Sequence, residues 1–560
     1  MTVEQRTPTA IDNVAEAWVD TLADLVPEVG TYLGRTEVNH RHSDVSPAGH
    51  DRVADAARAT VAALHDLEPV DDIDLVTKTD LSAELTLMLE QHDAKTHLRD
   101  INVIESPAQQ FRSAYDLMPT ATAEDWAIIS RRMSALPAAI DGYIETLREG
   151  VRQGVVPARR QVVEVVTQIG RYSDKSGFFA TLVAEASPAE GELPASLARE
   201  LEDNSGAARV AYETLAEFLR SELAPAASEQ DGVGREQYAL ASRRFLGATI
   251  DLDETYEWGI QELARMIAEQ EAIANEIKPG ASVEEAVALL EQDPSRKLHG
   301  TAALQKWMQE TSDRAVAELG ATHFDIPAEV RTLECMIAPT QEGGIYYTGP
   351  SDDFSRPGRM WWSVPEGVTE FDTWRELTTV YHEGVPGHHL QIGQATANRG
   401  QLNSWRRVLA GSSGHAEGWA LYAERLMQQL GYLDDPADRL GMLDGQRMRA
   451  ARVVLDIGVH LGKPRLNGEE GIWDADYALE FMMGNVNMPE AFVRFEVNRY
   501  LGWPGQAPSY KVGQRIWQNA RDEYEAKKGA DFSMKEFHKK ALDLGGVGLD
   551  TLTSYLRNLA

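Results

Sequence analysis

Hydrophobic residues recur every three to four positions along most of the first 335 residues, which is the period of an amphipathic α-helix. The pattern is clearest at residues 10–26, 124–151 and 253–277. It stops at residues 331–370, where the short segments RTLECMIAP, GGIYYTGP and RMWWSVPEG are separated by glycine and proline, and it resumes afterwards. We therefore predict a mainly α-helical protein with one small antiparallel β-sheet.

No change of composition separates distinct domains along the chain. Clusters of proline, glycine and polar residues at 186–194 and 223–234 are typical of connections between helices. We expect residues 1–330 to form a helical scaffold and residues 331–560 to carry the sheet and the candidate chemistry. Both parts are expected to belong to one integrated structural unit.

Composition excludes some classes of partner. The chain of 560 residues has 88 acidic and 54 basic side chains, and a formal charge of −34 repels nucleic acid and anionic lipid surfaces. Cys335 is the only cysteine, so no disulfide can form within the chain. We find no secretory leader and no apolar run of about 18 residues, which predicts a cytoplasmic protein with no membrane partner. Nothing in the sequence indicates an oligomeric state.

The candidate chemistry is concentrated in the segment YHEGVPGHHLQ at residues 381–391. In an H-E-x-x-H motif, two histidines four residues apart bind zinc on one helix face, and the glutamate activates a water molecule. Here the fourth position after His382 is Pro386, which cannot bind a metal. On a regular helix His388 would lie about 120° from His382, and His389 would lie about 10 Å along the axis. The backbone must therefore deviate at Pro386-Gly387.

We favour His388 over His389 as the second metal ligand, with Glu383 as the general base. Catalytic zinc needs a third protein ligand, and Glu417 in the segment HAEGWALYAE is the natural candidate. Glu424 lies on the same helix face and is expected to support a ligand from behind. The alternative is that these residues belong to ordinary helices without a metal.

Both segments resemble a bacterial family, domain of unknown function 885, whose signature is H-E-x-x-P-G-H-H followed by E-G-W-A-L-Y-x-E. The resemblance extends to residues 355–358, 452–460 and 504–513. That family looks like a distant member of the gluzincin peptidases, similar to carboxypeptidase Taq, thimet oligopeptidase and angiotensin-converting enzyme. The resemblance implies a helical zincin-like body with a deep central cleft, and it implies the zinc ligands His382, His388 and Glu417 with Glu383 as base.

Further residues are candidates for contacts with a substrate. Tyr510 resembles a tyrosine of carboxypeptidase Taq that is suited to stabilise an oxyanion, although a core tyrosine is the alternative. Arg452, Asp456 and His460 lie on one helix stripe. Either Arg452 and His460 contact a substrate or an oxyanion, with Asp456 in support, or all three form a buried ion-pair network. The other candidates are carboxylate anchors or residues at the rim of the site: Arg447, Arg449, Lys511, Tyr346, Tyr347 and His389.

These observations predict a metallopeptidase that holds one zinc ion and hydrolyses short peptides, as an oligopeptidase or a carboxypeptidase. Two alternatives remain open. One is a zinc hydrolase of a non-peptide amide or ester, and the other is a catalytically silent helical binding protein.

Overall fold

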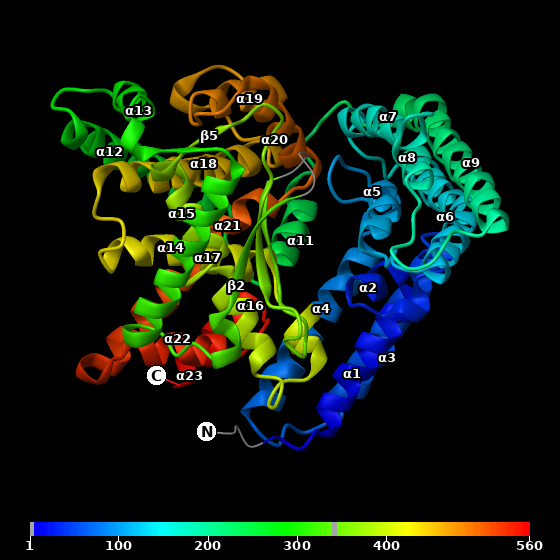
Figure 1. The fold of residues 1–560 in the computed structure, drawn as a ribbon, viewed down its shortest axis with the longest axis horizontal. Helices are drawn as coiled ribbons and strands as arrows, with labels where there is room; N and C mark the ends of the chain where they lie inside the picture. Colours follow the sequence, from blue (N-terminus) through cyan, green and yellow to red (C-terminus); the bar gives the residue numbers. More distant parts are fainter. Residues whose placement is uncertain (1–4, 339–343, 560) are drawn as a thin grey trace.

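The computed structural model describes residues 5–338 and 344–559. Its helices form two bodies that lie side by side in Figure 1. We call residues 5–227, drawn in blue to cyan, the N-terminal body, and residues 228–559, drawn in green to red, the C-terminal body. Helices dominate both bodies, so the prediction of a mainly α fold is confirmed.

The N-terminal body is a set of antiparallel and crossing helices with capped ends. The long helix α6 begins at a capping box, in which Thr122 and Asp125 each bond to the backbone amide of the other. Helix α6 packs along α9, and both contribute to a core that is separate from that of the C-terminal body. The helices are α1 (Ala10–Leu25), α2 (Pro27–Tyr32), α3 (Pro47–His65), α4 (Asp72–Asp93), α5 (Pro107–Ser113), α6 (Ala123–Gln153), α7 (Arg159–Ser173), α8 (Phe178–Ala184), α9 (Ala195–Phe218) and α10 (Ala224–Ala226).

The C-terminal body is organised around two helix pairs, because α12 packs along α18 and α17 packs along α21. Helix α15 packs on both α17 and α18, so the segment that begins with His382 lies among these helices. The helices are α11 (Arg235–Leu246), α12 (Leu252–Ile277), α13 (Val283–Glu291), α14 (Thr301–Thr322), α15 (Thr373–Glu383), α16 (His388–Ala397), α17 (Ser413–Gln429), α18 (Pro436–His460), α19 (Ala475–Met483), α20 (Glu490–Gly502), α21 (Gln506–Lys528), α22 (Met534–Leu542) and α23 (Leu549–Leu559).

Short 3-10 and π turns lie between the longer helices. They are η1 (Thr36–Val38), η2 (Thr96–Arg99), η3 (Ala114–Leu117), η4 (Leu219–Leu223), η5 (Pro294–Arg296), η6 (Ala328–Arg331), η7 (Trp405–Leu409), η8 (Leu466–Gly468) and η9 (Gly529–Asp531).

The small sheet is mixed, and the prediction that it is antiparallel was wrong for one of its strand pairs. Strand β4 (Gly358–Trp362) lies in the middle, parallel to β2 (Leu333–Ile337) and antiparallel to β3 (Ile345–Thr348). Because β3 pairs with β4 rather than with β2, the chain crosses over before it returns beside β2. A separate antiparallel pair joins β1 (Lys297–His299) to β5 (Glu370–Asp372). Residues 339–343 lie outside the described residues, and they include the last residue of one predicted strand segment and the first residue of the next.

The expected division at residue 330 does not coincide with a break in packing. The largest hydrophobic core contains Tyr256 of α12 and Leu319 of α14 together with Trp419 of α17 and Val454 of α18. Residues 228–330 therefore share a core with the candidate metal-binding helices, because α12 lies along α18. The interpretation of the chain as one integrated unit stays a prediction.

The two bodies contact one another through α4 and the segment around η7. The Gly548 amide donates to the Asp80 carboxylate of α4 at 2.9 Å, and Trp405 packs into the core formed by α1, α3 and α4. A cavity of about 910 Å³ lies between the bodies. Its lining includes Ser412 and Ser413 at the start of α17 but none of the expected metal ligands. The expected cleft at the metal site is therefore not this cavity.

Candidate metal centre

The HEGVPGHH segment forms two helices joined by a sharp turn rather than one helix with a bulge. Helix α15 ends at Glu383, residues 384–387 form the turn, and α16 begins at His388. The turn places the His388 ring 4.9 Å from the His382 ring, measured between centroids. The predicted deviation at Pro386-Gly387 is confirmed, and its effect is to return His388 to the side of His382.

Two features of the turn explain why it needs these residues. The Gly387 amide donates to the Tyr381 carbonyl at 3.0 Å, and a Cβ on Gly387 would lie 1.9 Å from the His382 carbonyl oxygen. Only glycine therefore fits there. The indole of Trp419 in α17 donates to the carbonyls of Pro386 and Gly387, at 2.9 and 3.2 Å. The turn is thus fixed to the helix that carries Glu417.

Close packing of α17 against α21 positions Glu417. A Cβ on Gly418 would lie 2.4 Å from a backbone atom of Gly513, so glycine allows the two helices to approach closely. The N-terminus of α17 is capped by Ser412, whose hydroxyl accepts from the His415 amide at 3.1 Å. Glu417 follows one turn later and faces α15.

Three donor atoms meet in this region. Glu417 Oε2 lies 3.2 Å from His382 Nε2 and 3.5 Å from His388 Nε2. Tetrahedral ligands at about 2.0–2.1 Å from a zinc ion are about 3.3 Å apart, so both spacings fit one shared metal ion. The Glu417 side chain remains 23% exposed, which leaves one side of the cluster open to solvent. Burial would raise the pKa of Glu417, but the hydrogen bonds from the two histidines hold it well below its ordinary range.

A chain of buried polar side chains supports His382 from behind. His382 Nδ1 donates to Glu424 Oε1 at 2.7 Å, and Glu424 Oε2 accepts from the Gln446 amide at 3.2 Å. Gln446 in turn accepts from Lys511 Nζ at 2.7 Å. Burial would lower the pKa of His382, but its bonds to Glu417 and Glu424 raise it to about 10. The residues around His382 thus favour a cation at this position.

Glu383 lies beside the two histidines without a hydrogen bond to either. Ligand atoms of His382, Glu383 and His388 all lie within 4.8 Å of one another. Glu417 is closer to both imidazoles, so we assign it rather than Glu383 to the set that could hold a metal. Burial raises the pKa of Glu383, and the neighbouring histidines oppose this shift. A carboxylate of this kind is suited to accept a proton.

Two more side chains converge on the cluster from α18 and α21. The Arg449 guanidinium lies over the Tyr510 ring, 5.8 Å from its centroid, and the Arg449 Nε has no partner among the described residues. Burial, and then the negative charge of Glu417, raise the pKa of Tyr510 to about 12. The phenol therefore stays protonated and can donate a hydrogen bond at neutral pH.

The comparisons with known proteins identify the family. A family model described as "Bacterial protein of unknown function (DUF885)" matches residues 27–556. The chain belongs to DUF885. Two solved structures share the fold of this DUF885 protein. A "putative lipoprotein" from Colwellia psychrerythraea is 20% identical over 99% of both chains, with a TM-score of 0.85. A "putative lipoprotein of unknown function" from Shewanella oneidensis is 18% identical over 98% of this chain and all of that chain, with a TM-score of 0.75. No curated protein matches the chain.

These two structures correct the expectation of a cytoplasmic location. Both proteins are described as lipoproteins, so a DUF885 fold cannot be assigned to the cytoplasm by default, and we withdraw that assignment. In the part of the chain that the structure describes, no helix combines the length and the apolar character needed to cross a bilayer.

His389 is directed away from the cluster, and the preference for His388 as the metal ligand stays a prediction. Its Nε2 donates to the Val330 carbonyl at 2.7 Å, and its Nδ1 accepts from the Tyr347 hydroxyl at 2.9 Å. Burial lowers the pKa of His389 to about 4, so the ring is neutral. These bonds join α16 to the sheet, and they do not leave His389 or Tyr347 free for the predicted substrate contacts. Tyr346 is exposed and stacks on Trp361.

The stripe of Arg452, Asp456 and His460 forms a buried polar network. Arg452 pairs with Glu496 at 2.7 Å and donates to the Tyr500 hydroxyl. Asp456 accepts from the Tyr238 hydroxyl and the Gly505 amide, and it contacts none of the candidate ligands. His460 Nε2 donates to the Tyr500 carbonyl. These contacts match the ion-pair alternative, although Arg452 also lies over the Tyr510 ring, 5.3 Å from its centroid.

The other predicted carboxylate anchors differ in their contacts. Lys511 is buried and pairs with Glu262 at 3.0 Å, so it supports the cluster rather than facing a substrate. Arg447 is bonded to Gln270 and Asn485. Arg449 is brought to the cluster. The contribution of Trp419 could have been suspected from its place in EGWALY, whereas no sequence signal identifies Gln446.

Proposed function

We propose that His382, His388 and Glu417 bind one zinc ion and that the protein hydrolyses peptide bonds in short peptides. The observation that carries the proposal is the placement of Glu417 Oε2 at 3.2 and 3.5 Å from the two imidazole Nε2 atoms. The carboxylate behind His382 adds support, because ligating histidines usually donate their other N–H to such a group.

When bound, zinc would polarise a substrate carbonyl and lower the pKa of water. Glu383 would accept the proton from the attacking water and return it to the leaving amine. Tyr510 would donate a hydrogen bond to a developing oxyanion, and its raised pKa keeps that proton in place. Arg449 adds positive charge over the Tyr510 ring, which would favour the same negatively charged oxygen.

The choice of peptides as substrates rests on the resemblance to gluzincin peptidases, which supports the proposal by analogy of fold. A zinc hydrolase of other amides or esters would use the same residues. A silent binding protein would have no need of a buried carboxylate such as Glu383 beside the two histidines.

The test is Glu383→Gln with exposed Glu366→Gln as its matched control. We expect the purified wild type and both variants to contain one equivalent of zinc by elemental analysis. Cleavage of a mixed pool of short peptides, followed by mass spectrometry, should fall about 100- to 10,000-fold in Glu383→Gln only. Unchanged cleavage in that variant would refute the assigned base, and a wild type without zinc would refute the metal site.

A further inference from the structure

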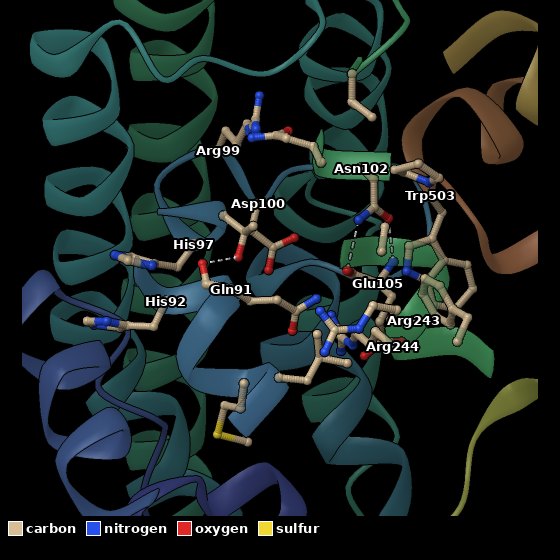
Figure 2. Close-up of a pocket in the computed structure, with 18 of the residues that line it drawn as sticks. Gln91, His92, His97, Arg99, Asp100, Asn102, Glu105, Arg243, Arg244 and Trp503 are labelled. Atoms are coloured by element: carbon tan, nitrogen blue, oxygen red, sulfur yellow. Dashed lines mark hydrogen bonds between the residues drawn. The ribbon is translucent and has the colours of Figure 1, made fainter. Parts of the chain in front are cut away.

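The cavity between the two bodies is a mostly apolar site with a few charged groups, and the proposed hydrolysis does not use it. Its volume of about 910 Å³ lies within the range of about 300–1,000 Å³ that is common for small-molecule pockets. Figure 2 shows that Gln91, Asp100 and Asn102 reach it from the N-terminal body, whereas Arg244 and Trp503 reach it from the C-terminal body. A ligand in this cavity would therefore contact both bodies.

Four charged side chains that line the cavity have no hydrogen bond or ion pair with any described residue. Two are basic, Arg99 and Arg244, and two are acidic, Glu84 and Asp100. One guanidinium nitrogen of Arg99, Nη2, is fully buried without a partner. The neighbouring Arg243 differs, because it forms an ion pair with Glu90. The lack of partners is thus specific to these four side chains.

Asp100 and Arg244 are exposed, and Glu84 and Arg99 are half-buried, so all four groups are accessible to a ligand that enters the cavity. Arg244 is close enough to lower the pKa of both Glu84 and Asp100, although it forms an ion pair with neither. Burial and then the charge of Asp80 raise the pKa of Glu84 to about 8, so this carboxyl keeps its proton at neutral pH until a cation approaches. Each carboxyl would be stabilised in its ionised form by a cation entering the cavity.

The rest of the lining is suited to a ligand that also has an apolar part. Leu87 and Met88 of α4 lie on one wall, and Phe245 and Trp503 lie on the wall formed by the C-terminal body. A mostly apolar wall with a few convergent charged groups is typical of a specific small-molecule site. The required ligand carries both a positive and a negative group.

We propose that this cavity binds a short peptide with free ends, with its α-ammonium group at Glu84 and Asp100 and its carboxylate at Arg244 and Arg99. Arginine suits the carboxylate because its planar guanidinium can donate two parallel hydrogen bonds. A tripeptide spans at most about 11 Å, so a pocket of this volume accommodates it. The site is separate from the metal cluster, with Ser413 in its wall one helical turn before Glu417.

The test is calorimetric titration of the Glu383→Gln protein with trialanine, because this background prevents hydrolysis during the measurement. We expect saturable binding at the cavity in addition to binding at the metal cluster, and only the cavity component should be weakened, at least about 10-fold, by Arg244→Gln and by Asp100→Asn. Trialanine amide and N-acetyl-trialanine, which each lack one terminal charge, should bind at least about 10-fold more weakly. Exposed Arg220→Gln serves as the control and should leave binding unchanged.

A second variant tests the site by steric hindrance, in case a substitution of a charged side chain destabilises the protein. Ala83 lines the cavity from α4, and Ala83→Trp should narrow it and weaken peptide binding without removing any charge. Equal affinity for the amide and the free peptide would overturn the proposal, as would unchanged binding in both Arg244→Gln and Ala83→Trp. The result does not depend on turnover, so a failure here is distinguishable from a failure of the proposed hydrolysis.

Discussion

The metal cluster and the cavity between the bodies differ in whether their charged side chains have hydrogen-bond or ion-pair partners. In the cluster, His382 is bonded to Glu417 on one side and to Glu424 on the other, and Gln446 and Lys511 continue the chain of contacts. In the cavity, Glu84, Asp100, Arg99 and Arg244 have no such partner among the described residues.

This difference distinguishes two kinds of binding site. The cluster is preorganised, since its ligands are held in place before a metal arrives, and binding costs little rearrangement. The cavity instead leaves its charges for a ligand to pair. Substitutions in the cluster should therefore lower the affinity for the metal. Substitutions in the cavity should instead change the affinity for the peptide and the pH dependence of the free energy of unfolding.

The largest expected effect comes from the choice between adjacent histidines. His388→Ala removes a donor atom of the cluster, and zinc affinity should fall more than about 100-fold, beyond the usual effect of losing an outer partner. His389→Ala removes only the bonds to Val330 and Tyr347, so zinc should still bind. Competition with a fluorescent chelator measures both affinities. Greater zinc loss in His389→Ala would reverse the assignment.

The turn between α15 and α16 should be nearly as sensitive. In Gly387→Ala the new Cβ would lie 1.9 Å from the His382 carbonyl oxygen, so the backbone must move. We expect a loss of about 3 kcal/mol in the free energy of unfolding, together with weaker zinc binding. Gly400→Ala is the control, because a Cβ there meets no atom within 4 Å. Equal urea midpoints for the two variants would contradict this account of the turn.

The sequence predicts the cluster well because its information is local. His382, Glu383 and His388 lie within seven residues, and the proline and glycine between them indicate the break that the structure shows. Glu417 and Glu424 share one helix face, so the position of the first suggested the second. The mainly α fold could be predicted for the same reason, since helical periodicity is a local property.

The remaining features depend on contacts between distant segments. The parallel pairing of β2 with β4 is decided by the crossover and not by the residues of either strand. Arg452 was predicted as either an anchor or a network member, and only the approach of Glu496 and Tyr500 distinguishes them. The cavity combines Glu84 and Asp100 with Arg244 and Trp503, which no sequence pattern connects.

The support behind His382 should have an intermediate effect. Glu424→Ala removes the acceptor for His382 Nδ1 and should lower zinc affinity about 10- to 100-fold. Glu424→Gln retains an oxygen acceptor and should lose less. Chelator competition gives both values, with exposed Glu525→Ala as the control. If all three variants bind zinc as the wild type does, the contact does not contribute to the preorganisation of the cluster.

The smallest expected effect concerns Glu84, a carboxyl of the cavity that has no partner among the described residues. Burial and the adjacent Asp80 raise its pKa to about 8, and Arg244 opposes the shift. The unfolded chain loses this proton near a pH of about 4.3, so the folded state binds the proton more tightly. Stability therefore falls as the pH rises from there to about 8, by no more than about 1.4 kcal/mol per unit.

Replacing Glu84 by glutamine should remove this dependence. Since the carboxyl faces a cavity rather than a closed core, we expect a total change of about 1 kcal/mol between pH 5 and pH 8. Urea unfolding at both values measures it: Glu84→Gln should gain stability relative to the wild type at pH 8, and exposed Glu68→Gln should not. An identical difference between wild type and Glu84→Gln at both pH values would show that Glu84 is well solvated, and the contrast between the cavity and the metal cluster would then rest on its arginines alone.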